Sequence, residues 1–322
     1  NAVIKAGARA GEAEQAERWL QRIADAGLHP TLRSYNTALD ACARSGDLAR
    51  AEQLLDRMQA NGVAMDVTTC NAMIKALANR GDLQAAERWI SVMKERGPAP
   101  DITSINTLLK GYAQACDVKS VEKWLEDMQG LAVPPDVVSY TTAINACARM
   151  GNPSRAEHWL VTMSESGVEP TLPTYRAVIK ACARGKESGR AEHWLEEMLR
   201  ARVDPGIQAF NSVINAKGRE GYMAQAERCF ESLLHRGYAP DLFSYGALID
   251  GYARGGQLQS AQSWLAQAQA RGLRPNLVIY GQLLNGCAKA RSRRPELARE
   301  TAEQCLRDLV GASIMPDHIA YC

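Results

Sequence analysis

Cationic side chains recur along the chain in steps of 35 residues or multiples of 35. Seven of these positions hold arginine or lysine: Arg9, Arg44, Arg149, Arg184, Arg219, Arg254 and Lys289. A second position lies four residues before this one in the repeat, on the same face of a helix. It holds Lys5, Lys75, Lys110 and Lys180. A single surface arginine is usually only solvated, whereas seven in register favour a track that neutralises phosphate groups. A glutamate that also recurs every 35 residues offsets the row, and the formal net charge is only +2.

Histidine and cysteine form no catalytic pattern in this sequence. No two of the nine cysteines have C-x-x-C spacing, and none of the five histidines is followed by glutamate as in a zinc deaminase. Four cysteines share one repeat position, too far apart in a stacked array for disulfides, so small buried side chains are predicted: Cys42, Cys147, Cys182 and Cys287. We therefore predict no enzyme, no metal site and no cofactor in this chain.

The elements that must position the cations are repeated pairs of helices. In Pro135–Arg149, apolar residues at Tyr140, Ile144 and Cys147 have the spacing of one helical face, and a glycine suited to ending the helix follows. A second helix carries an Ala-Glu-x-Trp-Leu pattern, whose tryptophans we assign to the core between layers rather than to base stacking. One such hairpin cannot bury its apolar face alone, so the sequence predicts an all-α fold, an α-solenoid of stacked helix pairs.

The repeats divide the chain into one continuous array. It reads as a partial repeat 1–31, then 32–66, 67–101, 102–136, 137–171, 172–206, 207–241, 242–276 and 277–317, with another repeat starting at 318–322. The last complete repeat has six extra residues between Lys289 and Ala302, predicted to form a basic surface loop around Arg291–Pro295. No apolar run is long enough for a membrane helix, so no membrane insertion is expected. Because both ends fall inside repeats, we expect a piece of a longer protein whose targeting segment lies outside it.

The 35-residue period, with Pro-Asp before a Val-x-x-Tyr-Asn helix start, resembles the pentatricopeptide repeat family over essentially the whole chain. The resemblance implies a right-handed α-solenoid superhelix that binds single-stranded RNA, about one base per repeat, in an organellar setting, chloroplast or mitochondrion. It also implies roles in RNA processing, stabilisation or translation. In this family, the residue after the tyrosine and the last residue of the repeat select the base.

Carried over residue by residue, the resemblance implies six base-reading pairs: Asn1 with Thr31, Asn36 with Asp66, Asn71 with Asp101, Asn106 with Asp136, Thr141 with Thr171, and Asn211 with Asp241. The four Asn/Asp pairs imply uracil, whose pairing edge alternates acceptor and donor as an amide does. The resulting order is 5′-Y-U-U-U-R-N-U-N-N-3′. The pairs Arg176 with Gly206 and Gly246 with Asn276 depart from the usual ones, so their repeats are expected to be unselective or not engaged.

Two alternatives remain open from the sequence. The aspartates are also good helix N-caps, although capping does not require asparagine inside a helix, where it is a poor former. The whole array could instead be a scaffold subunit of a large organellar protein or ribonucleoprotein assembly, using its groove or outer face for protein contacts. The degenerate pairs favour that second function, and the consecutive Asn/Asp pairs favour RNA.

Overall fold

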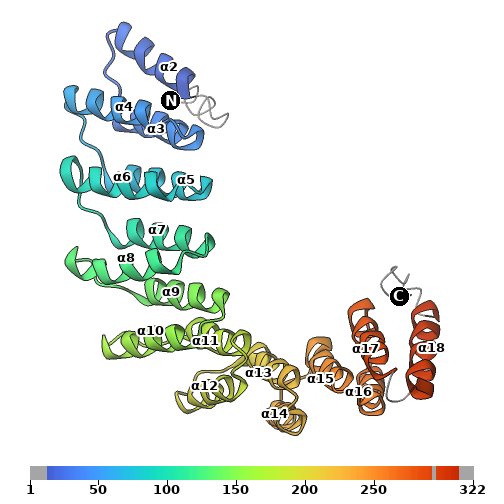
Figure 1. The fold of residues 1–322 in the computed structure, drawn as a ribbon. Helices are drawn as coiled ribbons and strands as arrows, with labels where there is room; N and C mark the ends of the chain where they lie inside the picture. Colours follow the sequence, from blue (N-terminus) through green and yellow to red (C-terminus); the bar gives the residue numbers. More distant parts are fainter. Residues whose placement is uncertain (1–12, 292–294, 312–322) are drawn as a thin grey trace. The chain divides into compact units, whose positions relative to one another are not determined.

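The computed structural model describes residues 13–291 and 295–311, and it divides into two compact units, Asn1–Ala146 and Cys147–Cys322. Seventeen α-helices and no strand occur among these described residues (Figure 1). The predicted site residues Asn1 and Arg9 lie outside the described part of the chain. The predicted all-α solenoid of helix pairs is confirmed within each unit, and we describe the units separately.

The first unit contains α2 and three helix pairs. Its helices are α2 (Ala13–Asp25), α3 (Leu32–Ser45), α4 (Leu48–Ala60), α5 (Val67–Arg80), α6 (Leu83–Arg96), α7 (Ile102–Gln114) and α8 (Val118–Gly130). Helix α9 (Val137–Met150) crosses the division between the two units. In this unit each first helix begins directly after the residue that ends the preceding repeat, as the 35-residue pattern predicts.

The second unit continues the alternation. Its helices are α10 (Pro153–Glu165), α11 (Leu172–Arg184), α12 (Ser188–Arg200), α13 (Gly206–Glu220), α14 (Met223–His235), α15 (Leu242–Arg254), α16 (Leu258–Ala270), α17 (Leu277–Ala290) and α18 (Pro295–Gly311). No helix among those described is long and apolar enough to cross a membrane.

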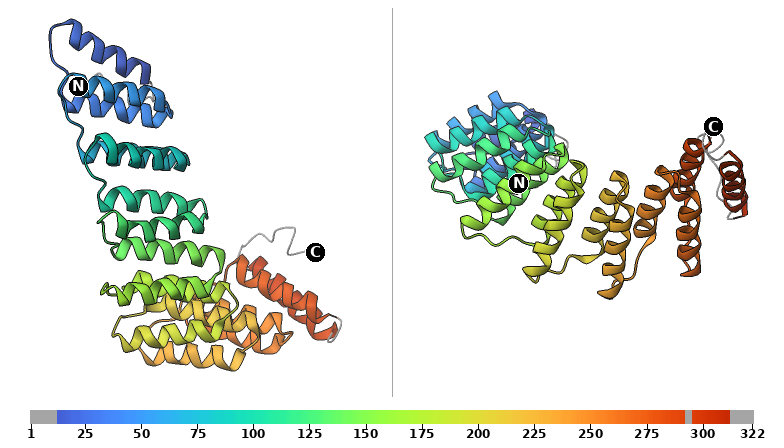
Figure 2. Two further views of the ribbon diagram at one scale, coloured as in Figure 1. Left: turned by 60° about the vertical axis from the view of Figure 1, so that its left-hand side comes forward. Right: turned by 60° about the horizontal axis from the view of Figure 1, so that its bottom comes forward.

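Within each unit the first helices of successive repeats pack directly on one another, and each also packs on its own second helix (Figures 1 and 2). The approach is close between α13 and α15, where a Cβ added to Gly251 would lie 2.9 Å from the Cα of Gly218. Small residues at these positions allow the helices to approach, as expected for a stacked array.

Glycines and short polar residues set the turn inside each hairpin. Gly46, Gly81 and Gly221 follow first helices with φ between +81° and +87°, the left-handed conformation that ends a helix. Where glycine is missing, Cys116 and Lys186 adopt φ near +60°, at some cost in backbone strain. Among the N-caps of second helices, Asp47, Asp82 and Asn152 each accept a backbone N–H three residues ahead.

The cysteines behave as small core residues. Of the eight described, only Cys116 is exposed, and all eight are free thiols. Burial raises the pKa of the Cys42 thiol to about 11 and that of Cys229 to about 12. No cluster of three or more possible metal-ligating side chains occurs in the described ranges.

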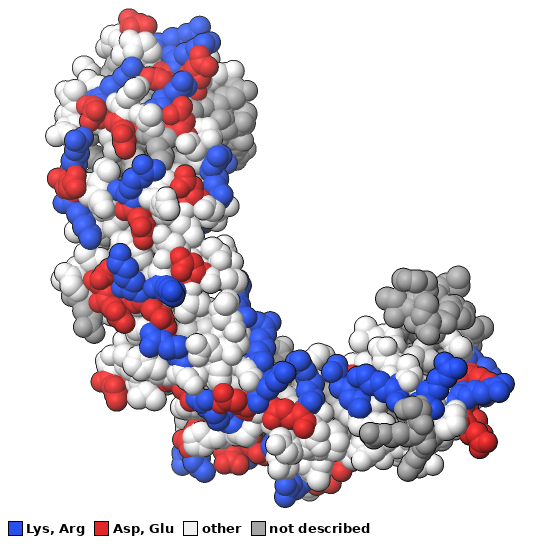
Figure 3. All heavy atoms as spheres, in the orientation of Figure 1, with Lys and Arg blue, Asp and Glu red and all other residues white. Residues whose placement is uncertain are grey.

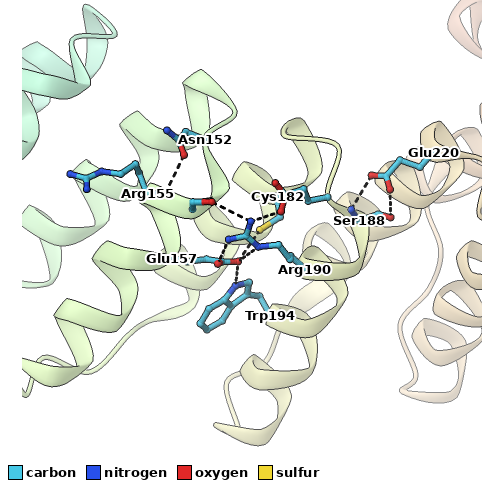
Figure 4. Close-up of polar contacts among 10 residues, drawn as sticks. Asn152, Arg155, Glu157, Cys182, Ser188, Arg190, Trp194 and Glu220 are labelled. Carbon is cyan, nitrogen blue, oxygen red and sulfur yellow. Dashed lines mark hydrogen bonds and ion pairs between the residues drawn. The ribbon is translucent and has the colours of Figure 1, made fainter.

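Tryptophans and glutamates connect neighbouring layers. Trp89, Trp124 and Trp159 are buried, which confirms their assignment to the core, while Trp19, Trp194 and Trp264 are half-buried. The indole of Trp194 donates to Glu157 at 2.7 Å, one repeat back, and Arg190 pairs with both oxygens of the same carboxylate (Figure 4). Burial would raise the pKa of Glu157, but these bonds outweigh it and lower that pKa. The recurring glutamate therefore joins neighbouring repeats through hydrogen bonds and ion pairs, and it also balances the charge of the cations.

The predicted loop in the last repeat is shorter than expected. Helix α17 ends at Ala290 and α18 begins at Pro295, so only residues 291–294 separate them, of which 292–294 lie outside the described residues. The other inserted residues lengthen α18 to 17 residues, whereas the other second helices have 13 or 14. Proline suits the first turn of a helix, and Glu296 is favourable beside the helix N-terminus, so this segment extends the helix.

Candidate nucleic-acid interface

Three of the predicted Asn/Asp pairs are joined by hydrogen bonds. In each, the asparagine Nδ2 donates to Oδ1 of the aspartate at 3.1 Å. The pairs are Asn71 with Asp101 and Asn106 with Asp136 in the first unit, and Asn211 with Asp241 in the second. Each amide comes from the first helix of one repeat and each carboxylate stands at the start of the next first helix. The stacking of repeats therefore brings together residues 30 positions apart.

A buried serine completes each of these pairs. Ser104, Ser139 and Ser244 lie at the third position of the following first helix and are fully buried. The Ser139 hydroxyl lies 2.7 Å from Oδ1 of Asn106 and 3.0 Å from Oδ1 of Asp136, and it accepts the Asp136 N–H. A hydroxyl has a single hydrogen, so the shorter contact identifies the asparagine as its acceptor. We name each set of three residues a triad.

The triad fixes which way the amide faces. The Asn106 Oδ1 meets a donor from Ser139, while its Nδ2 meets the carboxylate of Asp136. Turning the amide over would place its oxygen against the ionised carboxylate of Asp136, with two acceptors facing each other, so Asp136 sets the orientation and the Ser139 hydroxyl supports it by donating to Oδ1. One amide hydrogen and one Oδ1 lone pair have no partner within the triad, although Asn106 and Asn211 are only 7% and 4% exposed and Asn71 is half-buried. Together they complement an edge with an acceptor beside a donor, as in uracil.

The triad of the second unit has the most exposed carboxylate. Asp241 is exposed, whereas Asp101 and Asp136 are half-buried. Oδ1 of Asp241 accepts the N–H of Ser244 at 2.8 Å, so this residue also caps α15, and the same Oδ1 accepts the Asn211 amide. Capping was the alternative to base reading for the aspartates. The structure shows that one carboxylate can cap a helix and hold the amide at the same time.

Hydrogen bonds also keep two of the triad carboxylates charged. Partial burial would raise the pKa of Asp101, but donation from the Ser104 N–H and the Asn71 amide outweighs it and lowers the pKa. Asp136 has a lowered pKa for the same reasons. With the folded pKa lowered, this stabilisation is present above the unfolded value of about 3.9 and is lost as pH falls through the folded pKa. Around neutral pH these amides therefore face ionised partners.

The fourth Asn/Asp pair is not assembled. Asp66 accepts the N–H and the hydroxyl of Thr69, and Oδ1 of Asn36 is buried without a hydrogen-bond partner. Threonine stands here where the triads have serine, and its hydroxyl is directed to the aspartate. The prediction that Asn36 and Asp66 act as a joined pair is therefore not supported by any hydrogen bond between them.

The threonine pairs differ again. Thr31 is exposed and its hydroxyl lies 3.1 Å from that of Ser34. Thr171 makes the same kind of contact with Thr174, at 3.1 Å, and these two residues form a capping box, whereas Thr31 makes no side-chain hydrogen bond to the backbone of its helix. Thr141 is half-buried in the first unit, whereas Thr171 belongs to the second.

Every described cation of the predicted phosphate track is exposed, but some have partners. Arg44 and Arg254 form ion pairs with aspartates four residues earlier, and Arg184 donates to the carbonyl of Ala148 at 3.3 Å. Arg149 is also exposed and engaged within the chain. Arg219 and Lys289 have no such partner among the described residues. Figure 3 shows Lys and Arg gathered over the part of the second unit that contains α13 to α17.

Exposed apolar side chains occupy the second position of three first helices. Val138, Phe243 and Val278 are 41%, 59% and 64% exposed, respectively. They stand three residues before the base-reading position on the same helices. Neither these residues nor the triad serines were identified from sequence, although both sets keep the 35-residue spacing that could have revealed them.

Replacing Ser139 with alanine should weaken uracil binding by about fivefold, because the Asn106 amide loses the donor that orients it. Titration with single strands that carry uracil or cytosine at this position would measure the change. Asp117 caps α8 by accepting the N–H and the hydroxyl of Ser120, and Ser120 contacts no base-reading asparagine. Ser120→Ala is therefore a matched control for the effect on capping. If the two variants keep the same preference for uracil over cytosine, Ser139 does not orient the amide.

Comparisons with known proteins agree with this architecture. A model of the PPR repeat family matches residues 30–79, 65–114, 100–149, 135–184 and 205–254. A pentatricopeptide repeat domain model matches residues 1–45 and 174–220, and a PPR repeat model matches 243–273. No match is found among curated proteins.

Among solved structures, the chain is similar to the pentatricopeptide repeat protein PPR10 from maize, with 24% identity and a TM-score of 0.62. That match covers 99% of this chain and 50% of the maize chain, so the chain spans about half its length. A structure of PPR10 in complex with an 18-nt psaJ RNA element matches with 23% identity and a TM-score of 0.51, covering 94% and 48% of the two chains. At these identities the likeness concerns the fold.

Proposed function

The chain belongs to the pentatricopeptide repeat family, and from this premise we propose that it binds single-stranded RNA, about one base per repeat, with a preference for uracil. The observation that carries the proposal is the recurrence of the hydrogen-bonded Asn–Asp–Ser triad at three equivalent positions. Support also comes from the similar fold of PPR10, which is solved in complex with RNA. The protein would act by covering a transcript segment, blocking nucleases or remodelling local RNA structure.

The triads supply the selective part of the proposed interaction. Each fixed amide would donate to a carbonyl of uracil and accept its N3–H, while cytosine would place an acceptor at N3 against the amide oxygen. Apolar side chains such as Val138 and Phe243 would contact the flat faces of the bases, which every base offers. Exposed cations would contact phosphates without regard to sequence.

The proposed order of repeats defines the strand that tests the function. The triads at 67–101, 102–136 and 207–241 would bind uracils in a U-U-N-N-U spacing. We expect single strands with this spacing to bind more tightly than strands with cytosine at the three positions, because each mismatched base costs about 1–3 kcal/mol by analogy with other direct readout. The measurement is a titration of both strands at one salt concentration. Equal affinity would contradict base reading by the triads.

Exchange of Arg219 and Lys289 for alanine should weaken binding equally for all sequences. If each side chain neutralises one phosphate, the slope of log affinity against log salt should fall by about 0.7 for each cation removed. These two exposed cations have no partner in the described residues, so their removal breaks no ion pair. Arg228→Ala with Arg307→Ala, which removes equal charge from second helices, is the matched control.

If the double exchange leaves both affinity and slope unchanged, the track does not bind phosphate, and the alternative of a scaffold subunit gains support. The proposed organellar setting, chloroplast or mitochondrion, comes from the family resemblance. Fractionation of the source cells, followed by detection of the protein, would test it.

A further inference from the structure

Repeat 172–206 departs from the triad at all three of its positions. Where the triads have asparagine, aspartate and serine, this repeat has Arg176, Gly206 and, in the following helix, Ala209. The carboxylate and the hydroxyl that would orient an amide are both missing. The position therefore holds a side chain that only donates hydrogen bonds, with no acceptor side chain at the two neighbouring triad positions.

The guanidinium of Arg176 has no partner within the described residues, although the residue is half-buried in α11. A Cβ added to Gly206 would meet no atom within 4 Å, so the position that carries the aspartate in the triads is unfilled here. A half-buried guanidinium with unused donors favours a ligand that supplies acceptors. In repeat 242–276 the position equivalent to Arg176 holds Gly246, and a Cβ added there would lie 2.7 Å from Cδ1 of Ile279. The base-reading position of repeat 242–276 is thus closed by the apolar side chain of Ile279, whereas that of repeat 172–206 holds a cation.

Two further cations follow Arg176 on the same helix, four and eight residues on. Lys180 is exposed and without a partner among the described residues, whereas Arg184 donates to the carbonyls of Ala148 and Arg149. Lys180 is exposed and suits a phosphate, whereas the half-buried Arg176 occupies the base-reading position.

We propose that repeat 172–206 selects a base whose edge presents two adjacent acceptors, through the forked donors of Arg176. Guanine offers N7 and O6, and cytosine offers N3 and O2, whereas uracil and adenine alternate donors and acceptors on the corresponding edges. Two parallel N–H groups of a guanidinium match such a pair, and lysine cannot reproduce this geometry. This inference rests on the proposed RNA binding and replaces the expectation that the repeat is unselective.

The test is a set of four single strands, 5′-U-U-A-X-U-3′ within a constant flank, in which only X changes. We expect strands with G or C at X to bind about 5- to 100-fold more tightly than strands with U or A. A strand with 7-deazaguanine at X tests whether guanine is bound through N7 and O6, because this base keeps O6 and lacks the N7 acceptor. It should bind more weakly than the strand with guanine. Arg176→Lys should keep most of the affinity, since it keeps the charge, and should lose the preference for G or C.

Each outcome bears on a different proposal. If all four strands bind equally and Arg176→Lys changes nothing, Arg176 makes no contact with RNA and the inference is overturned. If Arg176→Gln weakens all four strands alike and lowers the salt slope, Arg176 contacts phosphate and the inference is also overturned. The proposed function would still stand if exchanging the triad uracils for cytosine weakens binding in the same assay. Loss of selectivity at the triads as well would overturn both. Circular dichroism of the variants, with unchanged helix content, confirms that they are folded.

Discussion

Replacing Trp124 with alanine is expected to lower the free energy of unfolding by about 3–5 kcal/mol, the usual cost of deleting a buried indole. Trp124 is 9% exposed, and its Nε1 donates to Glu87, one repeat back along the chain. Alanine would leave a cavity between two layers and would remove the donor from a half-buried carboxylate. In a stacked array this loosens the interface with the neighbouring repeat as well as the helix itself.

Urea unfolding of the wild type and the variant, followed by circular dichroism, measures this change in stability. Trp124→Phe keeps most of the apolar volume and loses the bond to Glu87, so it should be less destabilised than the alanine variant. Tyr222→Ala removes a large aromatic that is 53% exposed, and it should cost little. If Trp124→Ala unfolds at the same urea concentration as the wild type, the indole does not support the layer contact.

Much of the fold could be predicted because each repeat follows the same local rules. The apolar spacing defined the first helices, and several of the glycines after them do adopt the left-handed conformation. What the period could not predict was the structure where a repeat departs from the pattern. Cys116 and Lys186 take up positive φ without glycine, since the turn is imposed by the packing of the two helices. The inserted residues after Lys289 mostly join α18, because Pro295 can start a helix as well as interrupt one.

The candidate site was predictable in its pairs but not in its assembly. The Asn/Asp pairs follow from family resemblance, yet only three of four are joined, and the difference lies in one residue of the next helix. Ser139 donates to Asn106, whereas the hydroxyl of Thr69 is used by Asp66. Sequence alone does not distinguish the two hydroxyls, because serine and threonine each place one at this position. Which acceptor the hydroxyl faces depends on packing between repeats.

The largest effect on binding is expected from exchanging Asn71 and Asn106 for threonine together. The proposed uracil contacts need a donor and an acceptor on two separate atoms, as the amide nitrogen and oxygen provide, whereas a hydroxyl has a single oxygen with one hydrogen. The variant keeps Asp101 and Asp136 ionised at neutral pH, but neither receives an amide N–H. At about 1–3 kcal/mol for each mismatched base, the two changes should weaken binding to a U-U strand by more than tenfold. By resemblance, a threonine and aspartate pair suits guanine, so binding to the corresponding G-G strand should improve.

The experiment titrates the wild type and the variant with both strands at one salt concentration. Asn79→Thr with Asn145→Thr serves as the matched control, because both asparagines are exposed and make no hydrogen bond within the described residues. The control should bind U-U as the wild type does, which separates the effect of the triads from that of amides in general. The salt slope should be the same for all three proteins, since no phosphate contact is removed. If the triad variant binds both strands as the wild type does, these asparagines do not read bases, and the scaffold function becomes the better account of the array.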